Sequence, residues 1–167
     1  MTTKFYYGLE SIEQAREIAR KTVVILGNGK HQAAQPLILE TACAETQLGQ
    51  YPDRYEPEGF GLHQFDTIGL TDTIDRTREL DKLRVFNAFG FDVEKVTPES
   101  ISNDPVQSFV LCRLKYKLRP EEIPADFVSR AVYWKRFYNT EAGKGTVDHY
   151  LESAEKILYN QPTNPTR

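Results

Sequence analysis

Apolar residues recur at helical spacing along most of the chain. The first such segment opens with the order Ser-Ile-Glu-Gln at residues 11–14, which is typical of a helix capping box, and it ends near Leu26, before Gly27-Asn28-Gly29. One side of this segment is apolar, with residues three or four apart: Ile12, Ala15, Ile18 and Ala19. The pattern therefore predicts an amphipathic helix over residues 11–26.

The next segment, residues 32–48, is apolar on almost every side. Its apolar residues are spread around the whole circumference of a helix: Ala33, Ala34, Leu37, Leu39, Ala42, Cys43, Ala44 and Leu48. A helix without a polar face must be covered by its neighbours. We therefore expect this segment to be the buried central helix of the fold.

Residues 49–70 lose this periodicity. Glycines and prolines alternate there with the aromatic residues Tyr51, Tyr55, Phe60 and Phe65. We expect an irregular glycine-rich loop or a short hairpin, the type of segment that often forms binding sites. The aromatic side chains either stack on a ligand or fill the core beneath the loop.

Helical patterns resume over residues 72–88, 104–118, 124–139 and 145–159. Asp104-Pro105 places a capping residue before a proline at the first helical position. About six helices with little strand predict a mainly α domain, all-α or α+β, over residues 1–159. The polar remainder, residues 160–167, contains two prolines and is expected to be a flexible tail.

Composition excludes several classes of protein. The 167 residues include 21 Lys and Arg against 24 Asp and Glu, which gives a net charge of −3. This mild acidity argues against a protein that binds nucleic acid through phosphate contacts. The apolar runs are far shorter than the roughly 20 residues of a membrane span, and the first residues lack a signal-peptide core. We expect no membrane insertion and a cytoplasmic product.

The cysteines and histidines lack the spacing of a metal site. Cys43 and Cys112 lie in apolar segments and are expected in the core. With His31, His63 and His149 they form no closely spaced pair of the kind that binds zinc. We therefore expect neither a metal nor another cofactor, and we interpret His63 as a hydrogen-bonded residue in the wall of a site.

Two carboxylates lie in the predicted central helix, Glu40 and Glu45. Five residues rotate a helix by about 140°, so the two side chains cannot share one face. Glu45 comes at the end of the helix, where partial burial and the negative end of the helix dipole both raise the pKa of a carboxyl. A general acid near neutral pH needs such a shift. The alternative is a carboxylate paired with an arginine or bound to a loop amide.

Four segments resemble the lysozyme-like lytic transglycosylases, the soluble murein transglycosylase type related to goose-type lysozymes. Residues 45–48, Glu-Thr-Gln-Leu, are similar to the family's Glu-Ser/Thr-x-Phe/Leu signature. Residues 59–64, Gly-Phe-Gly-Leu-His-Gln, are similar to its Gly-x-Gly-Leu-Met-Gln segment, and residues 138–145 to its Ala-Tyr-Asn-Ala-Gly-Pro-Gly segment. Asp104-Pro105 occupies the place of an Asp-Pro segment. The resemblance spans roughly residues 33–158.

The resemblance implies cleavage of peptidoglycan glycan strands, with Glu45 as acid and then base. Gln64 and Tyr138 would bind substrate, Thr46 and Asn139 would orient the surroundings of Glu45, and Gly61 would let the loop approach the sugar. The sequence departs from the family at three places, with His63 for methionine, Thr140-Glu141 for alanine and Lys144 for proline. The basic stretch over residues 110–145, with eight Lys and Arg against four Asp and Glu, would complement anionic peptide stems.

Residues 64–69, Gln-Phe-Asp-Thr-Ile-Gly, and residues 133–136, Tyr-Trp-Lys-Arg, resemble a bacteriophage variant of this family. This implies a virion component or an endolysin that reaches the cell wall without a signal peptide. Phage tail or virion proteins would then be partners. Two other functions stay open. Asp66, beyond the glycine-rich loop, would be a second carboxylate that orients water in a hydrolytic muramidase. Alternatively, the fold would serve as a non-catalytic structural or wall-binding module of a phage tail.

Overall fold

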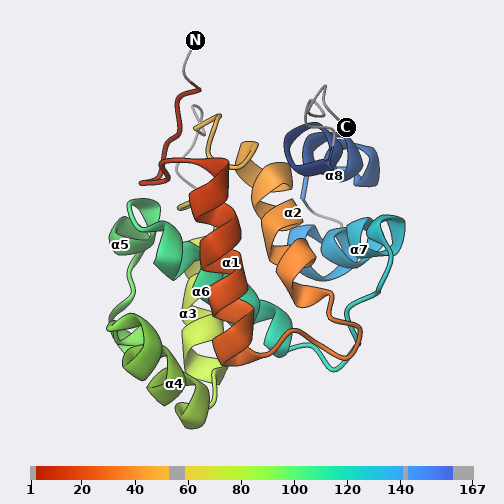
Figure 1. Ribbon diagram of the computed structural model, residues 1–167. Helices are drawn as coiled ribbons and strands as arrows, with labels where there is room; N and C mark the ends of the chain where they lie inside the picture. The colour runs from red at the N-terminus through yellow and green to blue at the C-terminus, as the bar shows by residue number, and fades with distance from the viewer. Residues whose placement is uncertain (1–2, 53–58, 141–142, 160–167) are drawn as a thin grey trace, which may run out of the picture.

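The computed structural model describes residues 3–52, 59–140 and 143–159 and is mainly helical (Figure 1). Its α-helices are α1 (Ile12–Leu26), α2 (Ala34–Thr46), α3 (Thr67–Arg76), α4 (Glu79–Phe89), α5 (Pro98–Ser102), α6 (Pro105–Lys117), α7 (Phe127–Trp134) and α8 (Val147–Ala154). A 3-10 turn spans Val93–Lys95, and α7 and α8 each continue into a π turn, Lys135–Asn139 and Glu155–Tyr159. The mainly α class is confirmed.

The glycine-rich loop contains little regular structure. Across the described ranges, β pairing is limited to an isolated antiparallel bridge between Phe60 and Phe65. Part of the segment for which a loop or hairpin was predicted, residues 53–58, lies outside the described residues, as does the predicted tail, residues 160–167.

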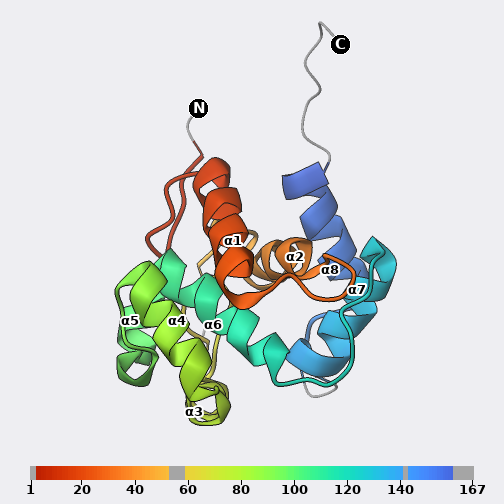
Figure 2. The same ribbon diagram turned by 60° about the horizontal axis from the view of Figure 1, so that its bottom comes forward.

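Helix α2 is the buried centre of the fold, as its apolar circumference predicts. Ten of its thirteen residues are buried, and it contacts α1, α6, α7 and α8. Figure 2, in which α2 is seen close to end-on, shows α1 on one side of it and α7 with α8 on the other. The group formed by α3, α4 and α5 lies across α6 from α7 and α8 (Figures 1 and 2).

A buried ion pair attaches α7 and α8 to this central helix. Glu40 of α2 is fully buried and receives two hydrogen bonds from Arg130 of α7, Nε to Oε1 at 2.8 Å and Nη2 to Oε2 at 2.9 Å. The hydroxyl of Tyr150 in α8 donates to Oε1 at 2.7 Å, and that of Tyr159 donates to Oε2. Both carboxylate oxygens thus have partners on the elements that cover α2.

Polar side chains of α6 bind the backbone carbonyl groups at the C-terminal end of α1. Arg113 Nε donates to the carbonyl oxygen of Gly27 at 2.8 Å, and Lys117 Nζ donates to that of Leu26 at 3.1 Å. These bonds satisfy carbonyl groups that a helix leaves free at its C-terminus. Both cysteines are free and buried, Cys43 in α2 and Cys112 in α6, which confirms their assignment to the core.

The helix predictions were wrong at two places, residues 72–88 and residues 98–102. The segment 72–88 is not one helix: α3 begins earlier because the Asp66 side chain caps it, and the extended residues Thr77 and Arg78 separate it from α4. Helix α5 was not predicted, although Thr97 and Ser100 form a capping box at its start. Among the described helices, none combines the length and the apolarity that crossing a membrane requires.

The ion pair predicts a large stability effect for one substitution. Arg130→Met would leave the Glu40 carboxylate buried without its cation, and we expect the free energy of unfolding at pH 7 to fall by about 3–5 kcal/mol in urea denaturation. Arg20→Met is the matched control, since Arg20 pairs with Glu17 on the exposed surface of α1 and should have little effect. Equal stability of the two variants would contradict this assignment.

Candidate active site

Glu45 lies in the last turn of α2, where the chain leaves the core. Gln47, which directly follows the last residue of α2, is left-handed with φ 53° and ψ 43°, and Leu48 and Gly49 follow with positive φ values of 53° and 77°. This turn directs the chain away from α2 and leaves the Glu45 side chain half-buried.

One oxygen of the Glu45 carboxyl is bound by an indole. Trp134, at the end of α7, donates from Nε1 to Oε2 at 3.1 Å. The indole is itself fixed, because its ring centroid lies 5.1 Å from that of Tyr150 and a Cβ at Gly145 would come within 2.5 Å of its Cη2 atom. Among the described residues, none forms a hydrogen bond to the other oxygen, Oε1.

Burial raises the pKa of Glu45 to about 7. The hydrogen bond from Trp134 and the positive charge of Lys115 act in the opposite direction and moderate the shift. Glu45 therefore loses its proton near neutral pH, as the interpretation of Glu45 as a general acid requires. The arginine-paired carboxylate of this helix is Glu40.

Lys115 of α6 is a half-buried cation whose charge acts on Glu45. Its Nζ atom lies 4.2 Å from the ring centroid of Tyr138 and 5.5 Å from that of Phe65, which are cation–π distances. Burial lowers the pKa of Lys115, while the charges of Asp66 and Glu45 raise it. From the sequence, Lys115 was only one member of a basic stretch.

Tyr138, in the π turn after α7, is buried beside Lys115. Its hydroxyl donates to the carbonyl oxygen of His63 at 2.7 Å, and its ring lies 5.3 Å from that of Tyr116. Burial raises the pKa of the Tyr138 phenol well above its usual value, so it remains a neutral donor. Tyr138 thus joins the π turn to the glycine-rich loop at the site of Glu45.

His63 is fully buried and hydrogen-bonded on both ring nitrogens, as predicted. Nε2 lies 2.9 Å from the carbonyl oxygen of Ile38, which can only accept, so Nε2 has the proton; Nδ1 then accepts from Ser108 Oγ at 2.6 Å. Burial lowers the pKa of His63 to about 3. The ring is neutral at physiological pH and is not a proton carrier.

Thr46, at the end of α2, and Gly61, in the glycine-rich loop, both have structural roles. The Thr46 hydroxyl donates to the carbonyl oxygen of Leu62 at 2.9 Å and accepts from the amide of Gly49 at 2.9 Å, so it joins the end of α2 to the loop. Gly61 has φ 76°, and a Cβ there would come within 2.7 Å of the Ile101 carbonyl oxygen in α5. Its close contact is with the protein's own backbone.

The amides of Gln64, expected to bind substrate, and of Asn139, expected to orient the surroundings of Glu45, are bonded within the protein. Gln64 Nε2 donates to the carbonyl oxygen of Gly61 at 2.9 Å and to the hydroxyl of Tyr7 at 3.4 Å. Asn139 Oδ1 accepts from Lys135 Nζ at 2.7 Å. Both side chains shape the loops next to Tyr138 and His63, and a ligand that used these groups would have to replace those bonds.

Asp66 is the N-cap of α3. Its Oδ1 atom accepts from the amide of Gly69 at 2.5 Å, and the side chain is exposed. Phe65, next to it, is buried in the core, which is the core-filling alternative for the loop aromatics; Tyr51 is 58% exposed and Tyr55 lies outside the described residues. Asp66 therefore already has a local structural role.

The raised pKa of Glu45 predicts a pH-dependent cost in stability. The folded pKa of about 7 lies above the ordinary value of 4.5, so the folded state binds more protons between these values and stability from this group falls as pH rises from 4.5 to 7. Urea denaturation should therefore show Glu45→Gln gaining on the wild type from pH 4 to pH 8, by about 3 kcal/mol. A difference that does not change with pH would refute the shift.

Comparison with known proteins gives no relative for this arrangement. No protein-family model, no curated protein and no solved structure matches the chain. Its function must therefore be inferred from the chemistry of Glu45 and its neighbours.

Proposed function

We propose that the protein is a peptidoglycan lytic transglycosylase that cleaves the MurNAc-β-1,4-GlcNAc bond with Glu45 as its acid and base. The observation that supports this most is the state of Glu45, a half-buried carboxyl with a pKa of about 7 and one oxygen held by Trp134. The resemblance of residues 45–48, 59–64 and 138–145 to that family supplies the substrate.

The reaction needs a single carboxyl. Protonated Glu45 gives its proton to the glycosidic oxygen as the bond from C1 to that oxygen breaks, and the resulting alcohol leaves. The C6 hydroxyl of the same MurNAc attacks C1, and its proton passes to the Glu45 carboxylate. The product is a 1,6-anhydro-MurNAc end, and Glu45 is again protonated.

The neighbours of Glu45 suit this cycle. Because Trp134 binds Oε2, the carboxyl cannot rotate freely, and the proton is presented on Oε1. The positive charge of Lys115 stabilises the carboxylate formed after the first step. Since Glu45 is partly desolvated, the carboxylate remains basic enough to accept the second proton.

A hydrolytic mechanism would need a second carboxylate to orient water. Asp66 is bound as the cap of α3, and this favours the single-carboxyl mechanism over the muramidase alternative.

Purified sacculi test this function directly. Mass spectrometry should find soluble anhydro-ended muropeptides from the wild type, and Glu45→Gln should reduce their release by about 10²–10⁴-fold because the proton donor is lost. Asp66→Asn is the control, since asparagine also caps helices well and should preserve activity. Reducing-ended products that disappear in Asp66→Asn would support a muramidase. Absence of product from a folded wild type that binds sacculi would support a non-catalytic module.

Lys115 should lower the pH above which the reaction slows, its alkaline limit. Activity requires protonated Glu45, so the rate should fall as pH rises through about 7. Because the charge of Lys115 lowers the pKa of Glu45, Lys115→Met should move this limit to higher pH. The pH dependence of kcat/KM measures the shift. Lys156→Met, which removes an exposed lysine of the last π turn, should leave the limit in place; an equal shift in both variants would refute the role of Lys115.

A further inference from the structure

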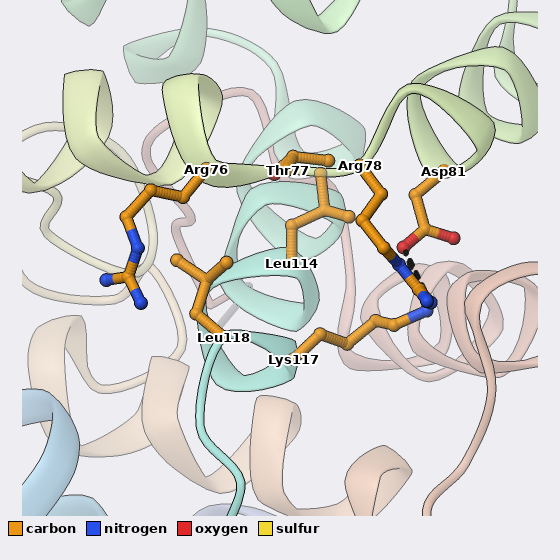
Figure 3. Close-up of a pocket in the computed structure, with 7 residues that line it drawn as sticks. All are labelled: Arg76, Thr77, Arg78, Asp81, Leu114, Lys117 and Leu118. Carbon is orange, nitrogen blue, oxygen red and sulfur yellow. Dashed lines mark ion pairs between the residues drawn. The ribbon is translucent and has the colours of Figure 1, made fainter.

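A second candidate site lies where α3 ends, α4 begins and α6 ends. The protein forms a cavity of about 220 Å³ there, lined from these three helices (Figure 3). Cavities that enclose a whole drug-sized ligand start at about 300 Å³, so this one suits a single side chain or a small organic ion.

The cavity combines an apolar base with basic sides. Figure 3 shows Leu114 of α6 and Leu118, which directly follows α6, in the middle, with Arg76 on one side and Arg78 and Lys117 on the other. A ligand in this position would contact aliphatic carbon below and guanidinium groups at both ends. This is the environment of a carboxylate attached to a short aliphatic chain.

The one carboxylate of the lining, Asp81, is already neutralised. Its side chain is 4% exposed and pairs with Lys117 at 3.0 Å and with Arg84 at 3.1 Å. Arg78 is farther from it, at 3.8 Å, and its side chain is 73% exposed. Arg78 can therefore turn to a ligand without leaving Asp81 unpaired.

Arg76 is the other available cation. It pairs with Asp72 at 3.2 Å, but both side chains are more than half exposed, so this pair contributes little and can be exchanged for a ligand. Counting Arg76, Arg78, Arg84 and Lys117 against Asp72 and Asp81, the cavity and its partners have an excess of two positive charges.

Helix α3 runs from Lys115, whose charge acts on Glu45, to the cavity. A Cβ at Gly69, near the start of α3, would lie 3.7 Å from Lys115 Nζ, and Arg76 follows seven residues later in the same helix. Seven residues of helix span about 10 Å. An extended peptide covers that distance with three residues.

We propose that this cavity binds a carboxylate of the peptide stem of peptidoglycan while the glycan strand lies at Glu45. The inference rests on the proposed function for the identity of the ligand. Arg76 or Arg78, each at its own end of the cavity, binds the carboxylate, and Leu114 and Leu118 contact the aliphatic part of the residue that bears it. The site then selects glycan strands whose peptide stems have free carboxylates over strands without stems or with amidated stems.

Binding of the stem alone tests this without any glycan cleavage. Free stem peptides, released from sacculi by an amidase, are titrated into ¹⁵N-labelled Glu45→Gln protein and followed by NMR. We expect saturable shifts at the amides of Leu114 and Leu118, and dissociation constants at least tenfold higher in the double variant Arg76→Gln/Arg78→Gln. Arg20→Gln, an arginine of an exposed pair on α1, should bind as tightly as the parent.

Three results would overturn the proposal: no saturable shift at these amides, equal binding by the double variant at unchanged urea stability, or equal binding of stems whose carboxyls are amidated. Acetate that produces the same shifts at the same concentration would indicate a general anion site and would also overturn it. The sacculus assay is independent, so wild-type release of anhydro products without stem binding would refute only this inference, and stem binding without product would refute only the transglycosylase.

Discussion

The buried ion pair between Glu40 and Arg130 is the interaction on which the arrangement of the other elements depends. Removing two charges from water costs several kcal/mol for each, and only a full set of partners offsets that cost. Glu40 has such a set, two guanidinium bonds and two tyrosine hydroxyls. These partners come from α7, α8 and the last π turn, so the pair determines how the C-terminal half packs on α2.

The same cluster reaches the candidate active site through aromatic contacts. Tyr150, which binds Glu40, packs against Trp134, and Trp134 binds Glu45. One helix thus presents two carboxyls with opposite properties on different faces. Glu40 is fully compensated and stabilises the fold, whereas Glu45 is bound by the Trp134 indole, and its ionisation destabilises the folded state because the carboxyl is buried. Groups that take part in a reaction commonly lower the stability of the folded protein in this way.

Local signals in the sequence predict the elements that depend on local interactions. Ser11 and the Asp104-Pro105 pair cap α1 and α6 where expected, and the apolar circumference of residues 32–48 predicts the burial of α2. The break between α3 and α4 has no such signal, because Thr77 and Arg78 are neither glycine nor proline.

The candidate site was predicted only in part, since its contacts join residues far apart in the chain. Glu45 follows from its place at the end of a buried helix, but Trp134 lies 89 residues away and only the folded chain brings them together. The signal that could have indicated Trp134 is that it is the single tryptophan of the sequence, close before the Tyr138 segment. Gln64 and Asn139 were predicted by motif alone, and pattern cannot show that their amides are bonded internally.

The left-handed turn after α2 connects the completion of the fold to the placement of Glu45. Gln47 and Leu48 are not glycines, and a left-handed conformation costs such residues roughly 1–2 kcal/mol each. The cost is offset by contacts that exist only in the assembled core, where Leu48 is fully buried and Thr46 bonds to Leu62. A peptide of this segment alone would not keep the turn. The geometry around Glu45 is therefore a property of the complete domain, and the site and the core form in one cooperative step.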